Sequence, residues 1–132
     1  MEMSFVSMDM LIIHLIGDYM LQSDNMAKNK EVSLKWAFIH AFVYTIPFIL
    51  LTLSIKALFF IMVTHAFIDR YKLAKYIIFY WNKLWNGPKS WHECDIKTGY
   101  SKQKPIWLAT WLFIIIDNTM HLILNATAIN FL

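Results

Sequence analysis

Most histidines of this sequence lie inside apolar stretches, where ionisable groups are costly. Four of the five histidines and four of the nine acidic residues occupy such stretches. Three stretches carry a His and an Asp four residues apart, which places both side chains on one face of a helix. Imidazole and carboxylate are ligands that suit Zn²⁺ and Mn²⁺. The pattern therefore predicts a metal centre built from His14, Asp18, His40, His65, Asp69, Asp117 and His121.

The order of the two residues differs between the pairs. The first and third apolar stretches read His-x-x-x-Asp, whereas the last reads Asp-x-x-x-His. In an antiparallel bundle this reversal brings the three aspartates to one level and the three histidines about one turn (~5.4 Å) away. Seven ligands exceed the need of one tetrahedral ion, so we expect one or two ions, Zn or Mn, with spare residues moving protons. We assign the catalytic role to His40 and Asp69.

Polar residues beside these pairs are candidates for contacting a substrate. Cations near the ends of apolar helices could meet a phosphate group, although such side chains often only extend toward water. The residues that we expect in this role are Gln22, Lys30, Arg70 and Lys72.

The elements that position these residues follow from composition. The 132 residues are 58% hydrophobic and only 16% charged, whereas soluble domains have about 25% charged residues. A chain this small cannot bury so much apolar surface in a water-soluble core. We therefore expect an integral membrane protein and exclude an ordinary cytosolic enzyme, a disordered tail and a nucleic-acid-binding module. The lone Cys94 excludes an internal disulfide framework.

Four apolar stretches predict an all-α fold, a polytopic four-transmembrane-helix antiparallel bundle in a single domain, 1–132. Lysines mixed with apolar residues after the third span predict that its helix continues as an amphipathic segment in the membrane interface. The expected spans are 5–23, 34–53, 55–72 with an extension to 85, and 105–131, with a polar loop at 86–104.

Lysines predict the orientation of the chain. They gather between the first and second spans and between the third and fourth, so the positive-inside rule makes those loops cytoplasmic and both termini external. We expect the inner membrane of a bacterium, or of a bacterial host, as the location.

At these same residues the chain resembles a family of small phage and bacterial integral membrane proteins, catalogued as a domain of unknown function. The shared motifs are H-x-x-G-D-[aromatic]-x-x-Q at His14–Gln22, H-x-x-x-D-x-x-K at His65–Lys72 and D-x-x-x-H at Asp117–His121. A weaker likeness is to membrane-bound metal-dependent hydrolases of bacteria and prophages, and it implies hydrolysis of a phosphoester at the membrane.

Together the residues and the resemblance favour a membrane-embedded metal-dependent hydrolase acting on a lipid or lipid-linked phosphoester. In this reading a metal-activated water attacks the ester. Two alternatives stay open: a transporter or channel for metal ions or protons, and a phage membrane protein such as a holin-like or superinfection-exclusion factor. The expected partners are the lipid bilayer and a lipid or lipid-linked substrate, with no nucleic acid, and a homo-oligomer stays open.

Overall fold

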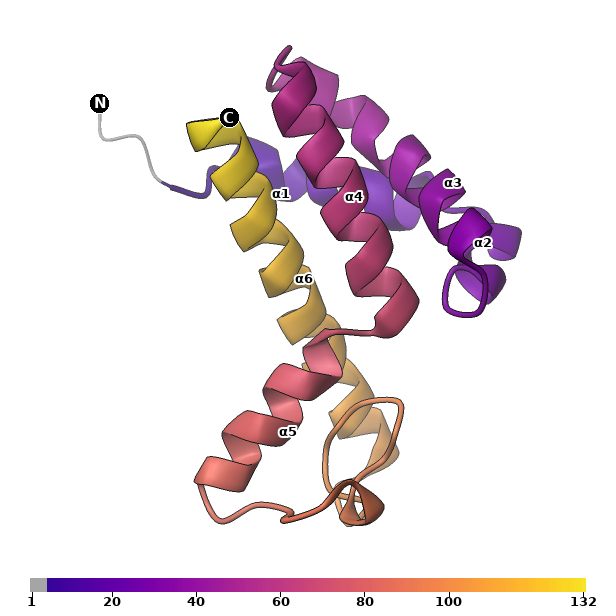
Figure 1. The fold of residues 1–132 in the computed structure, drawn as a ribbon, viewed down its shortest axis with the longest axis vertical. Coiled ribbons are helices and arrows are strands. Elements are labelled where there is room, and N and C mark those ends of the chain that lie inside the picture. The colour runs from indigo at the N-terminus through magenta and orange to yellow at the C-terminus, as the bar shows by residue number, and fades with distance from the viewer. Residues whose placement is uncertain (1–4) are drawn as a thin grey trace. The chain divides into compact units, whose positions relative to one another are not determined.

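The structure is a computed structural model that describes residues 5–132, and every regular element in that range is a helix (Figure 1). The all-α class predicted from the sequence is thus confirmed. The chain divides into two compact units, one formed by residues up to Tyr71 together with His121–Leu132 and the other by Lys72–Met120. The elements are α1 (Met8–Leu15), the π-helix η1 (Ile16–Met20), α2 (Asp24–Asn29), α3 (Leu34–Thr45), the 3₁₀ helix η2 (Ile46–Leu50), α4 (Ile55–Tyr71), α5 (Ala74–Leu84), the 3₁₀ helix η3 (Trp91–Glu93) and α6 (Ile106–Phe131).

Local signals set the helix boundaries in the first unit. The side chains of Ser7 and Ser23 accept hydrogen bonds from the backbone N–H groups of Met10 and Met26, and so cap α1 and α2. Pro47 stands at the start of η2, where the regular hydrogen bonding of α3 gives way to a tighter turn. Ser54 then accepts from the N–H of Ala57 and begins α4.

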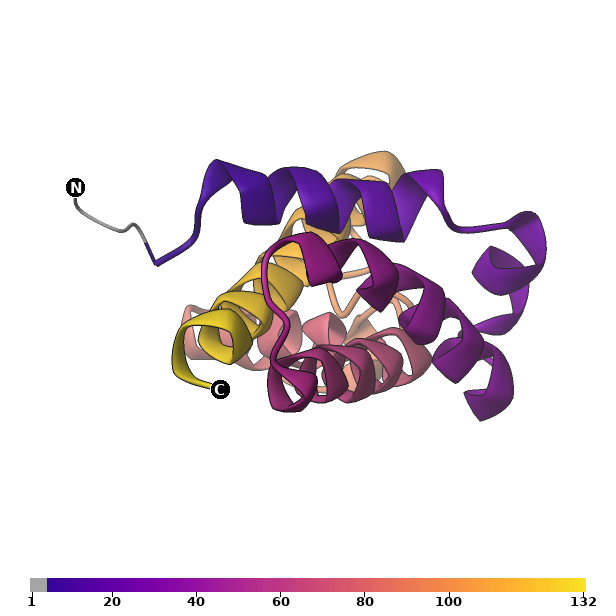
Figure 2. The ribbon, with the colours of Figure 1, turned by 90° about the horizontal axis from the view of Figure 1, so that it is seen from above.

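The core of the first unit lies between α1, α3 and α4. Tyr44, Phe48, Ala57 and Ile61 are fully buried in one apolar cluster, and α3 and α4 run side by side (Figure 1). Gly17 permits the close approach of η1 to α3, because a Cβ at this position would stand 2.8 Å from the backbone oxygen of Tyr44. Figure 2 shows α1 crossing α3 and α4 rather than running parallel to them.

The second unit consists of α5, the loop that follows it and the first turns of α6. Its core joins Ile78, Tyr100 and Ala109. The loop carries an antiparallel bridge between Cys94 and Ser101, and burial raises the pKa of the Cys94 thiol. Glu93, the last residue of η3, accepts hydrogen bonds from the backbone N–H groups of Ser90 and Lys89, which precede the helix. These donors lower the pKa of its carboxyl group.

The third expected span does not continue to residue 85 as one helix. The helix α4 ends at Tyr71, and Lys72 has a φ of 49°, a left-handed conformation that breaks the helix before α5. The break thus separates α5 from α4, where the sequence predicted one continuous helix.

The four-span bundle is not supported. Within residues 5–132, only α6 is both long enough and apolar enough to cross a membrane, and the next candidate, Leu34–Leu50, is shorter. The first expected span falls short because it is divided between the eight residues of α1 and the π-helix η1. The single domain expected over 1–132 remains a prediction.

Candidate metal centre

Four predicted ligands come together in the interior of the first unit. The imidazoles of His40 and His65 are fully buried, and the carboxylates of Asp18 and Asp69 are 4% and 6% exposed as residues. Asp18 lies on η1, His40 on α3, and His65 and Asp69 one turn apart on α4. Side chains from three separate elements thus form one buried cluster that could hold a metal ion.

The distances between the four donor atoms fit a single ion. His40 Nε2 lies 3.1 Å from Asp18 Oδ1 and 3.3 Å from Asp69 Oδ2. His65 Nε2 lies 3.2 Å from Asp69 Oδ2, 3.7 Å from Asp18 Oδ1 and 3.0 Å from His40 Nε2. Around a tetrahedral ion with bonds of about 2.0–2.1 Å, neighbouring ligand atoms stand about 3.3–3.4 Å apart. The observed spacings lie on both sides of that value, so the donor set fits such an ion.

A lysine stands on one side of this group. Lys30, just after α2, places its Nζ 2.7 Å from Asp69 Oδ2, 3.4 Å from His40 Nε2 and 3.6 Å from Asp18 Oδ1. Its side chain is only 16% exposed. The ammonium compensates part of the charge of two buried carboxylates, which would otherwise carry a penalty of several kcal/mol each. Lys30, one of the four residues expected to contact substrate, thus touches three of the predicted ligands.

His121 supports the group from outside it. Its Nε2 lies 3.3 Å from Asp69 Oδ1, so His121 contacts one carboxylate oxygen of Asp69 while Oδ2 faces the other donors. Contacts of this kind orient a ligand and tune its basicity. The last turns of α6 thus contribute to the site through a residue that the sequence placed among the ligands.

His14 points elsewhere. Its Nδ1 lies 2.7 Å from the hydroxyl of Tyr44, which also accepts a hydrogen bond of 2.6 Å from Asn125. In a regular α-helix His14 and Asp18 would share a face, but the π-helix η1 widens the turn between them, as the bond from Leu21 N to Ile16 O shows. The two side chains therefore reach different partners.

Tyr44 is the residue that links these two sets. Its ring stacks on His65 with a centroid distance of 3.6 Å and an interplanar angle of 16°. This contact matters for His65 because its Nδ1, like that of His40, is buried with no hydrogen-bond partner among residues 5–132. Packing against Tyr44 therefore adds to the contacts of Nε2 in holding the imidazole of His65.

The sequence analysis did not identify Tyr44 and Asn125 as site residues. Tyr44 follows His40 by four residues, and Asn125 follows His121 by four. The same spacing that revealed the His/Asp pairs therefore places each on the face of a predicted ligand. A search that included tyrosine and asparagine would have found both.

Two further predicted residues, Gln22 and Arg70, belong to the first unit. Gln22 has a buried Oε1 with no hydrogen-bond partner among residues 5–132, and Arg70 donates a 2.6 Å hydrogen bond to the backbone oxygen of Glu31. Asp117 and Lys72 belong to the second unit, so the role of Asp117 as a ligand stays a prediction.

Comparison with known proteins assigns the chain to a family. The class that the structure defines is an all-helical protein with a buried His/Asp group. The chain belongs to the family described as Protein of unknown function (DUF3307), which it matches over residues 6–131. That match confirms the family resemblance, while the likeness to membrane hydrolases remains a prediction. No curated protein and no solved structure matches the chain.

Proposed function

We propose that the protein is a membrane-embedded, metal-dependent hydrolase of a lipid or lipid-linked phosphoester. The observation that carries the proposal is the set of five donor-atom distances, 3.0–3.7 Å, among Asp18, His40, His65 and Asp69. Two imidazoles and two carboxylates form a donor set suited to Zn²⁺ or Mn²⁺, and one ion accounts for the four donors.

The distribution of apolar side chains supports a lipid environment. Leu50, Leu53 and Ile55, at the turn between η2 and α4, are each more than 80% exposed, and Phe42 and Phe59 are more than 60% exposed. The same unit buries histidines and aspartates. Water-soluble proteins rarely expose apolar patches this extensive unless lipid or a partner covers them. Apolar side chains on the surface and ionisable side chains in the interior are the arrangement expected for a functional site within a bilayer.

A bound divalent cation would supply Lewis-acid activation of water and of the phosphoester. The chain's own residues account for the rest. In hydrolysis the oxygen of water forms a bond to phosphorus, the ester P–O bond breaks, and the leaving oxygen gains a proton. In this proposal Asp69, whose Oδ1 contacts His121, accepts the proton from water, and that proton then passes to the leaving oxygen. Lys30, which contacts Oδ2 of Asp69, donates a hydrogen bond to a phosphate oxygen.

The test is phosphate release by detergent-purified protein from dioleoyl phosphatidic acid and from a polyprenyl monophosphate, each with Zn²⁺ or Mn²⁺. Release should require metal, and His65→Gln should abolish it. The control is His92→Gln, which replaces an exposed histidine in the second unit and should leave phosphate release unchanged. Metal-independent release, or full activity of the His65 variant, would overturn the proposal. Liposomes should remain tight to the metal, because ion flux without hydrolysis would identify a transporter instead.

A further inference from the structure

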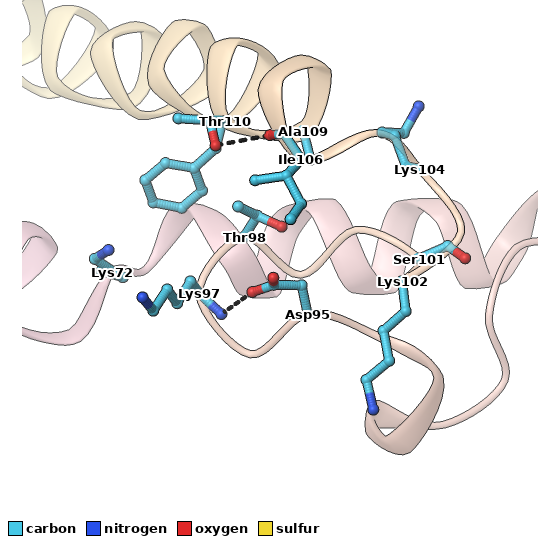
Figure 3. Close-up of a pocket in the computed structure, with 11 residues that line it drawn as sticks. Lys72, Asp95, Lys97, Thr98, Ser101, Lys102, Lys104, Ile106, Ala109 and Thr110 are labelled. Atoms are coloured by element: carbon cyan, nitrogen blue, oxygen red, sulfur yellow. Dashed lines mark hydrogen bonds between the residues drawn. The ribbon is translucent and has the colours of Figure 1, made fainter.

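The second unit carries most of the positive charge of the chain. Seven of the twelve basic residues lie in Lys72–Met120, together with three of the nine acidic residues. Four of these lysines line one cavity of about 390 Å³ between the loop and the first turns of α6 (Figure 3). They are Lys72, Lys97, Lys102 and Lys104.

The cavity has an excess of cations. Its lining contains one carboxylate, Asp95, so its formal charge is +3. That carboxylate is already engaged, because Asp95 Oδ1 accepts a 2.7 Å hydrogen bond from the backbone N–H of Lys97. In Figure 3 the side chains of Lys72 and Lys97 lie on one side of the cavity, whereas Lys102 and Lys104 extend outward from it. The cavity therefore attracts anions at low ionic strength.

The loop that presents these lysines is held in place. Asp95 N donates to Tyr100 O at 2.8 Å, and Lys102 N donates to Glu93 O at 2.9 Å. Gly99, with a φ of 78°, packs against the carbonyl of Lys75 so closely that a Cβ would overlap it. The backbone at Lys97 is thus held in place before any ligand arrives, which lowers the entropic cost of binding.

One wall of the cavity is apolar and another carries hydroxyl groups. Lys72 Nζ stands 5.6 Å from the centre of the Phe113 ring, beside Ile106 and Ala109. The hydroxyl of Thr98 accepts from the N–H of Tyr100 and still has its own proton to donate. A ligand that fits all three features has an anionic group with several acceptor oxygens joined to an apolar part.

We propose that this cavity is a binding site for a phosphate monoester that carries an apolar group, with Lys72 and Lys97 contacting the phosphate oxygens. A phosphate monoester carries about −1.5 to −2 charges at pH 7, which the lysines match. The apolar part lies against Phe113 and Ile106. The ligand chemistry is shared by an anionic phospholipid head group and by a free organic phosphate. The site uses none of the donors of the metal centre, so it stands independently of the proposed hydrolase.

The experiment measures binding to the full chain in a non-ionic detergent with EDTA present, so that metal plays no part. The probes are monodisperse dihexanoyl phosphatidic acid, dihexanoyl phosphatidylcholine, glycerol 3-phosphate and inorganic phosphate. Lys97→Gln should weaken binding of the phosphatidic acid roughly fivefold, and Lys72→Gln with Lys97→Gln roughly twenty-five-fold. The matched control, Lys83→Gln with Lys89→Gln, removes the same charge from the same unit outside the cavity.

The probes separate the two sources of the phosphate. Tight binding of phosphatidic acid with weak glycerol 3-phosphate supports the site and identifies a lipid ligand, whereas comparable binding of both supports the site and identifies a free organic phosphate. The proposal is overturned if no phosphate probe binds, if phosphatidylcholine binds equally well, or if the control pair loses as much affinity as the cavity pair.

Discussion

In the first unit Asp18 and Asp69 are buried with Lys30 and two imidazoles, whereas in the second unit Lys97 and Lys102 remain exposed around a cavity. The first arrangement depends on every partner, because an uncompensated buried charge carries a penalty of several kcal/mol. The arrangement in the second unit depends on several lysines that water already solvates, and each of these charges contributes little to anion binding. The comparison teaches that single changes should have large effects in the first unit and small, additive effects in the second.

The strongest test of this comparison is Asp69→Asn. The carboxylate contacts Lys30, His40, His65 and His121, so its loss leaves buried groups without compensation. We expect the affinity for Zn²⁺ to fall at least about a hundredfold. The free energy of unfolding should fall by about 3–5 kcal/mol. Metal analysis and unfolding in denaturing detergent measure the two effects.

The control for this change is Asp9→Asn, which alters an exposed carboxylate of α1 and should change neither quantity. A variant at Asp69 that kept stoichiometric, tightly bound metal would remove the basis for treating the two units differently.

A second test replaces Tyr44 by Phe, which keeps the ring that stacks on His65 and removes only the hydroxyl. The hydrogen bonds to His14 and Asn125 disappear in a buried site. We expect unfolding to become easier by about 2 kcal/mol and metal affinity to fall about tenfold. The exposed Tyr76 of the second unit provides the control as Tyr76→Phe, and an equal response of both variants would count against the comparison.

A third test, Lys30→Gln, should raise the affinity for metal, whereas the two changes above lower it. The ammonium stands 2.7 Å from a ligand oxygen of Asp69 and therefore opposes the entry of a second cation. Removing its charge should raise the affinity for Zn²⁺ about tenfold. Titration against a metal-sensitive dye measures this, with Lys28→Gln as the matched control. Weaker metal binding in the Lys30 variant would mean that the lysine supports the donor geometry instead of competing with the ion.

The smallest effect is expected at Glu93 in the second unit. The N–H groups of Ser90 and Lys89 lower its pKa below the ordinary value of 4.5, so its contribution to stability is present above that pH. The contribution disappears as the pH falls through the lowered pKa of the folded state. Glu93→Gln should abolish the pH dependence of the protection factor of the Ser90 amide, which is the intrinsic exchange rate divided by the observed one, measured by NMR between about pH 5 and pH 3. Persistence of that dependence would assign it to another group.

The sequence alone was sufficient for the helical class, the family and four residues that the structure brings together. This worked because the spacing of His65 and Asp69 within one helix fixes their common face, whatever surrounds the helix. The sequence also indicated Lys30, as a cation close to the His/Asp pairs that could contact a substrate. Its contact with the donor atoms depends on how the chain turns after α2, which residue spacing does not encode.

Other parts of the structure lay beyond such reasoning. Hydropathy marks apolar stretches but does not reveal where the hydrogen-bond pattern changes, as it does at η1 and at Lys72. For that reason the sequence predicted three regular spans where the structure has shorter helices. The link between Tyr44 and Asn125 joins residues 81 positions apart, and only the packing of helices brings them into contact.

Because Ile16–Met20 forms a π-helix, the position of Asp18 depends on the number of residues in this segment. A π-turn holds one residue more than an α-helical turn, so deleting a single residue there would restore ordinary winding and shift the side chains within the segment around the helix axis. Asp18 would then swing away from the imidazoles without any change in its chemical identity. Insertions and deletions in these five positions should accordingly be far less tolerated than substitutions at the outward-facing Tyr19 and Met20.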